Sequence, residues 1–252
     1  MTTRLIPGMV LAALMLIGAP AASAQTTTQL WANLTLDWVK SDRLVYELDL
    51  EPKALIDAPD GQPDWRNFDV TPNVEYSLKP WLDIQADLTI GRTTQTDDVD
   101  STEVTPRVGA RFHLFSRRQL LKVREQAPQR RIVVRDLVRF ESRNFFYTGG
   151  DADNEQTFRF RNRLEVLMPI NKPSITDDGA GYWLADWEWF LPLDDPEERF
   201  ANRQRIRGGI GYRRNFNWRY ELLYIWTRSR NTIDSGFSTN ENIIDVRVKR
   251  LF

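Results

Sequence analysis

The chain has 252 residues, with 34 lysines and arginines against 35 aspartates and glutamates, one histidine and no cysteine. The lack of cysteine excludes disulfides, thiolate zinc sites and thiol catalysis, and a single histidine excludes a multi-histidine metal centre. We therefore expect no metal ion and no cofactor. Charged residues make up 27% of the chain, yet it has nine tryptophans, a combination typical of a membrane barrel with a polar interior and an aromatic-girdled exterior.

The first 24 residues predict a secretory signal peptide. Arg4 supplies positive charge, residues 5–17 form a short apolar run, and Ala22-Ser23-Ala24 places small residues before a cleavage site. The run is too short to span a membrane comfortably, and no cysteine follows the cleavage site to carry a lipid. We expect 1–24 to be removed and 25–252 to form a single exported domain.

The rest of the sequence alternates apolar and polar residues with a period of two, which predicts β-strands with one apolar face. No stretch is long and apolar enough for a transmembrane helix, whereas each alternating segment is about as long as a tilted strand that crosses a bilayer. The eleven segments cover residues 30–38, 43–51, 68–78, 82–90, 104–114, 138–143, 158–166, 183–191, 205–212, 218–226 and 244–252.

Some connections between the segments are short turns and others are longer polar loops. Short turns occur at Lys40-Ser41-Asp42, Lys79-Pro80 and Asn215-Phe216-Asn217. Longer loops cover residues 52–65, 93–101, 144–156, 194–201 and 229–240. Short periplasmic turns and long external loops are the usual asymmetry of outer-membrane barrels, which normally have an even number of strands. We therefore predict ten strands if residues 30–39 do not span, or twelve if one strand is hidden, most plausibly within residues 116–131.

A soluble β-sandwich also alternates, but three features favour a membrane barrel. The apolar face is nearly unbroken, and the polar face carries more charge than a small soluble core would tolerate. Aromatic residues near segment ends would form interface girdles; they are Trp38, Trp81, Phe112, Trp218 and Trp226. The predicted fold class is all-β, an antiparallel transmembrane β-barrel of 10 or 12 strands of the outer-membrane type.

The last residue, Phe252, ends an alternating segment and resembles the C-terminal signature by which outer-membrane proteins are recognised for assembly. Arg250 departs from this pattern, because it stands at a position of the lipid-facing parity. We expect the protein to be a monomer in the outer membrane of a Gram-negative bacterium. Its partners would be the barrel-assembly machinery, outer-membrane lipid and lipopolysaccharide.

Several stretches also resemble a family of uncharacterised Gram-negative outer-membrane proteins of unknown function. They are QLWANLTLDW, RLVYELDLEP, NVEYSLKPWLDIQADLTIGR, RNRLEVLMPI, GGIGYRRNFNWRYELLYIW and the closing segment to Phe252. The resemblance covers nearly all of residues 29–252 and implies a barrel. It brings no activity and no catalytic residues.

Charge on the polar face is unevenly distributed. The first four segments carry mainly acids: Asp37, Glu47, Asp49, Glu51, Asp69, Glu75, Asp83 and Asp87. The segments from 102 to 212 carry mainly arginines: Arg107, Arg111, Arg139, Arg143, Arg159, Arg161, Arg163, Arg205 and Arg207. In a closed barrel these two sets form opposed lumen walls. Arginine suits such a wall because it stays charged and pairs with carboxylates in bidentate geometry.

Two interpretations of the walls remain open. The acids and arginines could pair across a narrow lumen and fill it, which we favour, or a hydrated lumen could filter polar solutes by charge and size. The corresponding function hypotheses are a porin-like narrow channel and a non-conducting barrel that acts through its external loops in adhesion or envelope maintenance.

A third hypothesis is a lipid-modifying enzyme, but the sequence gives it little support. His113 has lumen parity, Ser116 follows three residues later, and no G-x-S-x-G motif is present. The acidic loop 151–155 lacks EF-hand spacing, which favours a solvated loop. The arginines alternate with apolar residues, so we reject nucleic acid as a partner. We expect a protein without enzymatic activity.

Overall fold

A computed structural model describes residues 25–58, 64–96, 99–114, 132–148, 153–194, 203–230 and 237–252. The expected signal peptide, Ser116 and residues 151–152 of the acidic loop lie outside this part. The described residues form eleven β-strands. They include no helix with the length and hydropathy needed to span a membrane.

The strands are longer than the sequence pattern indicates, because each continues past its alternating core toward the connections. They are β1 (Gln25–Val39), β2 (Leu44–Asp57), β3 (Trp65–Lys79), β4 (Leu82–Gln95), β5 (Asp100–His113), β6 (Val133–Thr148), β7 (Glu155–Pro169), β8 (Ala180–Pro192), β9 (Arg203–Arg213), β10 (Trp218–Arg230) and β11 (Phe237–Leu251).

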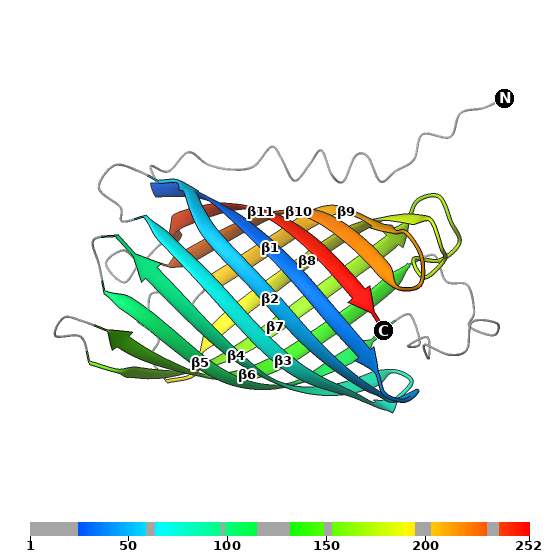
Figure 1. Cartoon of the computed structure of the whole chain (residues 1–252), viewed down its shortest axis with the longest axis horizontal. Coiled ribbons are helices and arrows are strands. Elements are labelled where there is room, and N and C mark those ends of the chain that lie inside the picture. The colour runs from blue at the N-terminus through cyan, green and yellow to red at the C-terminus, as the bar shows by residue number, and fades with distance from the viewer. Residues whose placement is uncertain are drawn as a thin grey trace.

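The strands form one closed barrel in which each strand runs antiparallel to the next in sequence (Figure 1). The exception is the seam, where β1 and β11 pair in parallel from Gln25↔Thr239 to Asp37↔Leu251. The expectation of 10 or 12 strands is therefore wrong. Residues 30–39 lie within β1, and an odd number of strands closes because a parallel pair also satisfies the backbone hydrogen bonds of both edges.

Because β1 and β11 run parallel at the seam, the first strand begins at one end of the cylinder and the last strand finishes at the other. We call the end with the β1–β2, β3–β4, β5–β6, β7–β8 and β9–β10 connections the turn end. The other, with the β2–β3, β4–β5, β6–β7, β8–β9 and β10–β11 connections, is the loop end. β1 begins at the loop end, whereas β11 finishes at the turn end.

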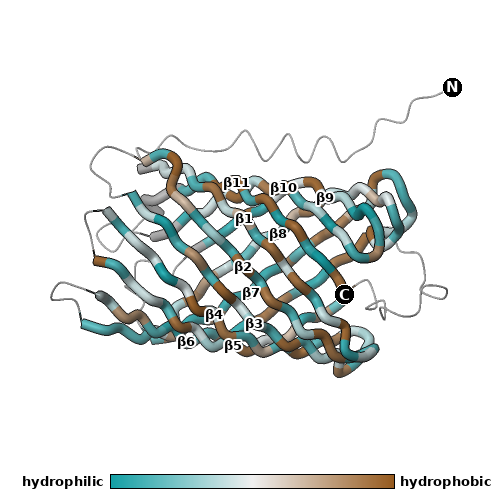
Figure 2. Tube along the Cα trace, in the orientation of Figure 1, coloured by the Kyte–Doolittle hydropathy of each residue, from teal (hydrophilic) through white to brown (hydrophobic). Residues whose placement is uncertain are grey.

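The period-two pattern divides the barrel into an apolar outer surface and a mainly polar inner surface, visible as alternating colours along the strands in Figure 2. Large apolar side chains are exposed on each of the eleven strands. Examples from across the barrel are Leu34, Phe68, Val108, Phe140 and Trp183.

Aromatic side chains gather on the outer surface at the turn end. Phe252 stacks on Trp38 across the seam with ring centroids 5.6 Å apart, and its backbone N–H donates to the carbonyl oxygen of Asp37 at 2.9 Å. The Arg250 guanidinium lies over the rings of Phe252 and Trp218, at 4.5 and 4.9 Å. These cation–π contacts explain a charged residue at an outward position.

Part of the lumen is filled by apolar side chains, an arrangement that the sequence pattern does not predict. This apolar cluster consists of Trp31, Leu167, Tyr182, Leu184, Leu223, Ile225 and Ile243, with Val133 and Ile175 packed against it. Ile175 belongs to the β7–β8 connection, so this turn-end segment also contributes to the cluster.

Glycines in β9 make room for the apolar cluster. A Cβ atom at Gly211 would lie 2.1 Å from the Tyr182 ring, and one at Gly209 would lie 2.5 Å from the Leu223 side chain. Since real Cβ atoms do not approach so closely, the two large side chains pack directly on the β9 backbone. Tyr182 also donates its hydroxyl proton to Glu221 at 2.6 Å.

Candidate functional site

A cavity of about 530 Å³ occupies the polar remainder of the lumen. Its lining includes both Glu103, near the loop end of β5, and His113, the last residue of that strand at the turn end. Trp31 and Leu184 line the cavity and also belong to the apolar cluster, so they form the boundary between the two regions. The cavity therefore follows most of the length of the barrel beside the apolar cluster.

All seventeen charged residues that the sequence assigns to the lumen walls line this one cavity. They are Asp37, Glu47, Asp49, Glu51, Asp69, Glu75, Asp83, Asp87, Arg107, Arg111, Arg139, Arg143, Arg159, Arg161, Arg163, Arg205 and Arg207. Strand alternation is the physical reason, because residues two apart point to the same face. Phe252, the proposed assembly residue, lies outside the lumen on the outer surface.

The ion pairs run along the wall of the lumen rather than across it. Arg107 of β5 pairs with Asp87 of β4, and Arg111 pairs with Glu75 of β3. Arg207 of β9 pairs with Asp186 of β8 at 2.7 Å. Each of these pairs joins adjacent strands or strands two apart in the barrel, and each therefore lies along the wall.

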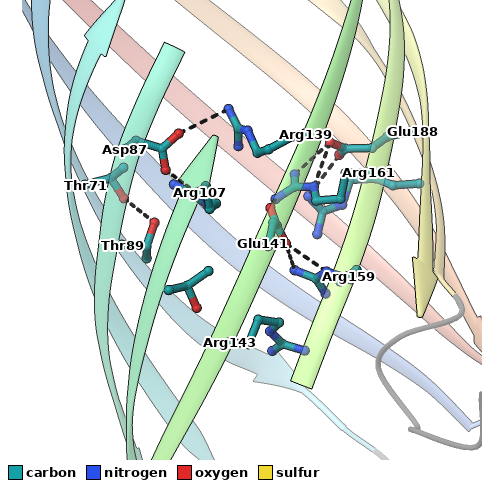
Figure 3. A network of polar contacts seen from close by, with 12 residues as sticks. Thr71, Asp87, Thr89, Arg107, Arg139, Glu141, Arg143, Arg159, Arg161 and Glu188 are labelled. Carbon is teal, nitrogen blue, oxygen red and sulfur yellow. Dashed lines mark hydrogen bonds and ion pairs between the residues drawn. The ribbon is translucent and has the colours of Figure 1, made fainter. Parts of the chain in front are cut away.

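A continuous chain of charges links β6 to β9, and Figure 3 shows the part of it from Glu141 to Glu188. Glu141 contacts Arg159 at 2.5 Å and Arg161 at 2.6 Å. Arg161 also contacts Glu188 at 2.7 Å, and Glu188 reaches Arg207 at 3.4 Å. Glu188 is only 1% exposed, so its charge depends on these arginines for compensation.

Three acids that contact the arginines of this wall are absent from the predicted wall residues, although all three have inward parity: Glu141, Asp186 and Glu188. Grouping each segment by its predominant charge hid them. Parity alone would have found them, since each stands two residues from another inward charge on its strand or directly opposite one.

Cations also occur within the acidic wall. Lys53 contacts Asp69 at 2.5 Å and Glu51 at 2.9 Å. Lys249 contacts Glu47 at 2.7 Å and Asp37 at 3.0 Å. The two walls are therefore less strongly opposed in charge than the sequence pattern indicates, because each contains counter-charges.

Two aromatic rings connect the walls through arginine. The Phe190 ring has the guanidinium carbons of Arg161, Arg159 and Arg205 within 4.5–5.1 Å. Arg205 also lies 5.1 Å from the Trp31 ring, which has Lys53 on it at 4.7 Å. The sequence signal for these two rings is an aromatic residue at a position of polar parity.

His113 takes part in a hydrogen-bonded group near the turn end. Its Nε2 atom lies 2.7 Å from Asp83 Oδ2, and the Ser77 hydroxyl donates to Asp83 Oδ1 at 2.6 Å. Asp83 therefore lies between the serine and the histidine. Activation of a serine requires a hydrogen bond from its hydroxyl to the base, so this geometry does not activate Ser77.

The described residues contain no group of three or more histidine, cysteine, aspartate or glutamate residues placed to hold a metal ion. In the acidic loop, Asp153 lies two residues before β7, and Glu155 is the first residue of that strand.

The family model described as "Protein of unknown function (DUF2490)" matches residues 28–237. The match spans more than half of the chain, and the chain therefore belongs to this family. This finding confirms the resemblance to an uncharacterised family. No curated protein and no solved structure matches the chain.

Proposed function

We propose that this DUF2490 barrel lies in the outer membrane of a Gram-negative bacterium, where its lumen is a narrow, charge-lined passage for small polar solutes. The observation that carries the proposal is the polar cavity, because its lining follows β5 from Glu103 to His113. A filter formed by charged side chains can discriminate solutes by charge and by size.

The outer surface supports the membrane location. Val108, Phe140 and Trp183 are 58%, 52% and 52% exposed, and similar residues surround the barrel. Soluble monomers rarely expose contiguous apolar patches of this extent. A closed barrel also leaves no unpaired strand edge, which is the condition for placing β-strands in hydrocarbon.

The aromatic residues at the turn end support a membrane interface at that end of the barrel. Trp38, Trp81, Phe112 and Trp218 lie near this end with Phe252, as expected for a girdle at one membrane interface. We place this end in the periplasm and the loop end outside, facing lipopolysaccharide. Export through a signal peptide at 1–24, assembly through the signature at Phe252 and a monomeric state belong to the same proposal.

Conductance through a planar bilayer tests the passage. Protein refolded in detergent should first migrate differently before and after boiling, because a closed barrel resists detergent. Thr105 lines the cavity, whereas Thr102 on the same strand has outward parity. We expect Thr105→Trp to reduce single-channel conductance at least several-fold and Thr102→Trp to leave it unchanged. Equal conductance in the two variants would remove the support for a lumen passage.

A second candidate function is a non-conducting barrel that acts through its loops. The apolar cluster favours it, because Leu223, Ile225 and Ile243 are almost fully buried and fill part of the lumen. A silent bilayer with verified insertion would select this candidate. We assign no enzymatic role to either candidate.

A further inference from the structure

Three arginines of the cavity lining gather on one aromatic ring, that of Phe190 of β8. The guanidinium carbon of Arg161 lies 4.5 Å from the ring centroid, that of Arg159 lies 4.9 Å from it and that of Arg205 lies 5.1 Å from it. We call these three arginines the arginine cluster. All three line the same cavity, as does Phe190, so their guanidinium groups converge on one place in the accessible lumen.

The carboxylates that compensate the arginine cluster are hidden from the cavity. Glu141 contacts Arg159 at 2.5 Å and Arg161 at 2.6 Å (Figure 3). Glu188 contacts Arg161 at 2.7 Å and Arg205 at 3.5 Å. The side chains of these two acids are 0% and 1% exposed, and neither acid is part of the cavity lining. A solute in the cavity therefore meets the guanidinium groups and not the carboxylates behind them.

The arginine cluster carries more charge than these acids compensate. Its three guanidinium groups share the carboxylates of Glu141 and Glu188. Glu188 is also shared with Arg207, at 3.4 Å. Positive charge therefore remains even when both acids are ionised. A recess whose walls carry one sign of charge focuses the electric field and concentrates ions of the opposite sign, so this part of the lumen should attract anions.

The arginine cluster is also held in place before any solute arrives. Arg161 donates from Nε and Nη2 to Glu188 and from Nη1 to Glu141. Arg159 donates from Nε and Nη2 to Glu141, and its Nη1 atom has no acceptor among the described residues. Side chains that are already ordered lose little conformational entropy on binding. Arg159 therefore offers a fixed donor that the surrounding wall does not use.

We propose that the arginine cluster binds an oxyanion, the carboxylate or phosphate group of a small solute. Arg159 and Arg205 donate to this group, and Arg161 holds the two acids behind the site. Guanidinium groups suit such a ligand because their N–H donors match the paired oxygens of carboxylate and phosphate. The inference deepens the proposed passage by naming the class of solute, and it rests on that passage only for the solute's route to the site.

Binding is measured in detergent, without a bilayer, so that it is independent of conductance. The probes are inorganic phosphate and oxalate, titrated calorimetrically into refolded protein at low chloride concentration, because salt screens the interaction between charges. Arg159→Gln and Arg205→Gln each remove one donor and one charge. Both variants should fold, because Glu141 and Glu188 each keep Arg161 as a partner.

Arg163→Gln is the matched control inside the lumen. Arg163 lines the same cavity and belongs to the same strand as Arg159. In the register, however, Arg161 lies opposite Phe190, whereas Arg163 lies opposite Glu188. The control therefore removes the same charge from the same cavity, but one inward position farther along β7 from the ring. It separates a local site from the general electrostatic field of the lumen.

We expect saturable binding of at least one probe to the wild-type protein. Arg159→Gln and Arg205→Gln should each lower the affinity about tenfold or more, as expected for loss of a hydrogen bond to a charged group. Arg163→Gln should lower it less than about threefold, because it changes only the more distant field. Heat-modified migration on a gel verifies that each variant is folded, and either cluster variant alone decides the test. Tighter binding of phosphate or of oxalate then identifies the preferred group.

The proposal fails if the folded wild-type protein binds neither probe, or if a folded cluster variant binds as tightly as the wild type. It also fails if Arg163→Gln weakens binding as much as Arg159→Gln does, since the field of the whole lumen would then account for the affinity. Binding together with a silent bilayer would support the site and contradict the passage. Conductance without binding would contradict the site and support the passage.

Discussion

The two regions of the lumen differ in how they satisfy burial. The apolar cluster removes aliphatic and aromatic surface from water and packs against glycine backbone at β9. The polar cavity keeps space beside its charges and compensates them along the wall, as in the chain from Arg159 through Glu141 and Arg161 to Glu188. One period-two pattern thus builds both a packed apolar cluster and a polar cavity inside a single barrel.

The largest expected effect comes from removing a shared acid on the polar side. Glu188→Gln leaves Arg161, Arg205 and Arg207 without their common counter-charge. We expect it to lower the free energy of unfolding by about 3–5 kcal/mol, the usual cost of an uncompensated buried charge. Urea unfolding of the refolded barrel measures the change, with Asp42→Asn in the exposed β1–β2 turn as the control. A loss as small as that of the control would mean that solvent, not the arginines, compensates Glu188.

The apolar cluster is tested by a matched pair of glycine substitutions in β9. Gly211→Ala places a methyl group against the Tyr182 ring, whereas a Cβ atom at Gly208 has nothing within 4 Å. We expect Gly211→Ala to destabilise the barrel by about 1–3 kcal/mol through overpacking and Gly208→Ala to change stability by less than about 0.5 kcal/mol. Equal effects in the same urea experiment would show that Tyr182 does not pack on the β9 backbone.

A smaller effect is expected on the outer surface, where neither lumen region is involved. Arg250→Gln removes the cation from the rings of Trp218 and Phe252. Exposed cation–π contacts contribute about 0.5–1 kcal/mol, so the free energy of unfolding should fall by this amount. The control is Arg66→Gln, because Arg66 is exposed at an outward position of β3. An increase in the free energy of unfolding would contradict this, because it would mean that the charge at position 250 destabilises the barrel.

The orientation of the two regions in the membrane is tested without changing stability. The chain has no cysteine, so single-cysteine variants can be labelled with a membrane-impermeant maleimide on intact cells. We expect labelling of Thr26→Cys and Asp153→Cys at the loop end and none of Ser41→Cys at the turn end. The reverse pattern would invert the proposed orientation.

The sequence predicts which face each side chain occupies but not which side chains meet. Alternation correctly places Asp37, Glu75, Arg107 and Arg159 in the lumen, because strand parity is a local property. Parity contains no information about register or barrel closure. Pairing of Arg139 opposite Arg161, and the parallel seam between β1 and β11, therefore emerge only from the three-dimensional structure.

The strand count illustrates the same limit. Counting alternating segments gives eleven, and the rule that outer-membrane barrels have even numbers changes this to ten or twelve. The rule assumes antiparallel closure, whereas this barrel closes with a parallel pair. The sequence also does not predict the apolar cluster. Leu223 and Ile225 have inward parity, but their packing inside the lumen depends on the space left by Gly209 and Gly211 on the neighbouring strand.

Single-channel recording of the refolded wild-type protein beside Arg163→Glu tests the central claim most directly. Arg163 lines the cavity and lies opposite Glu188 in the strand register, so heat-modified migration on a gel first verifies that the charge-reversed variant is folded. The account predicts discrete conductance steps in both proteins, with a reversal potential shifted toward cation selectivity in the variant. A bilayer that stays silent with verified insertion, or steps with unchanged selectivity, would contradict a passage through the charged lumen.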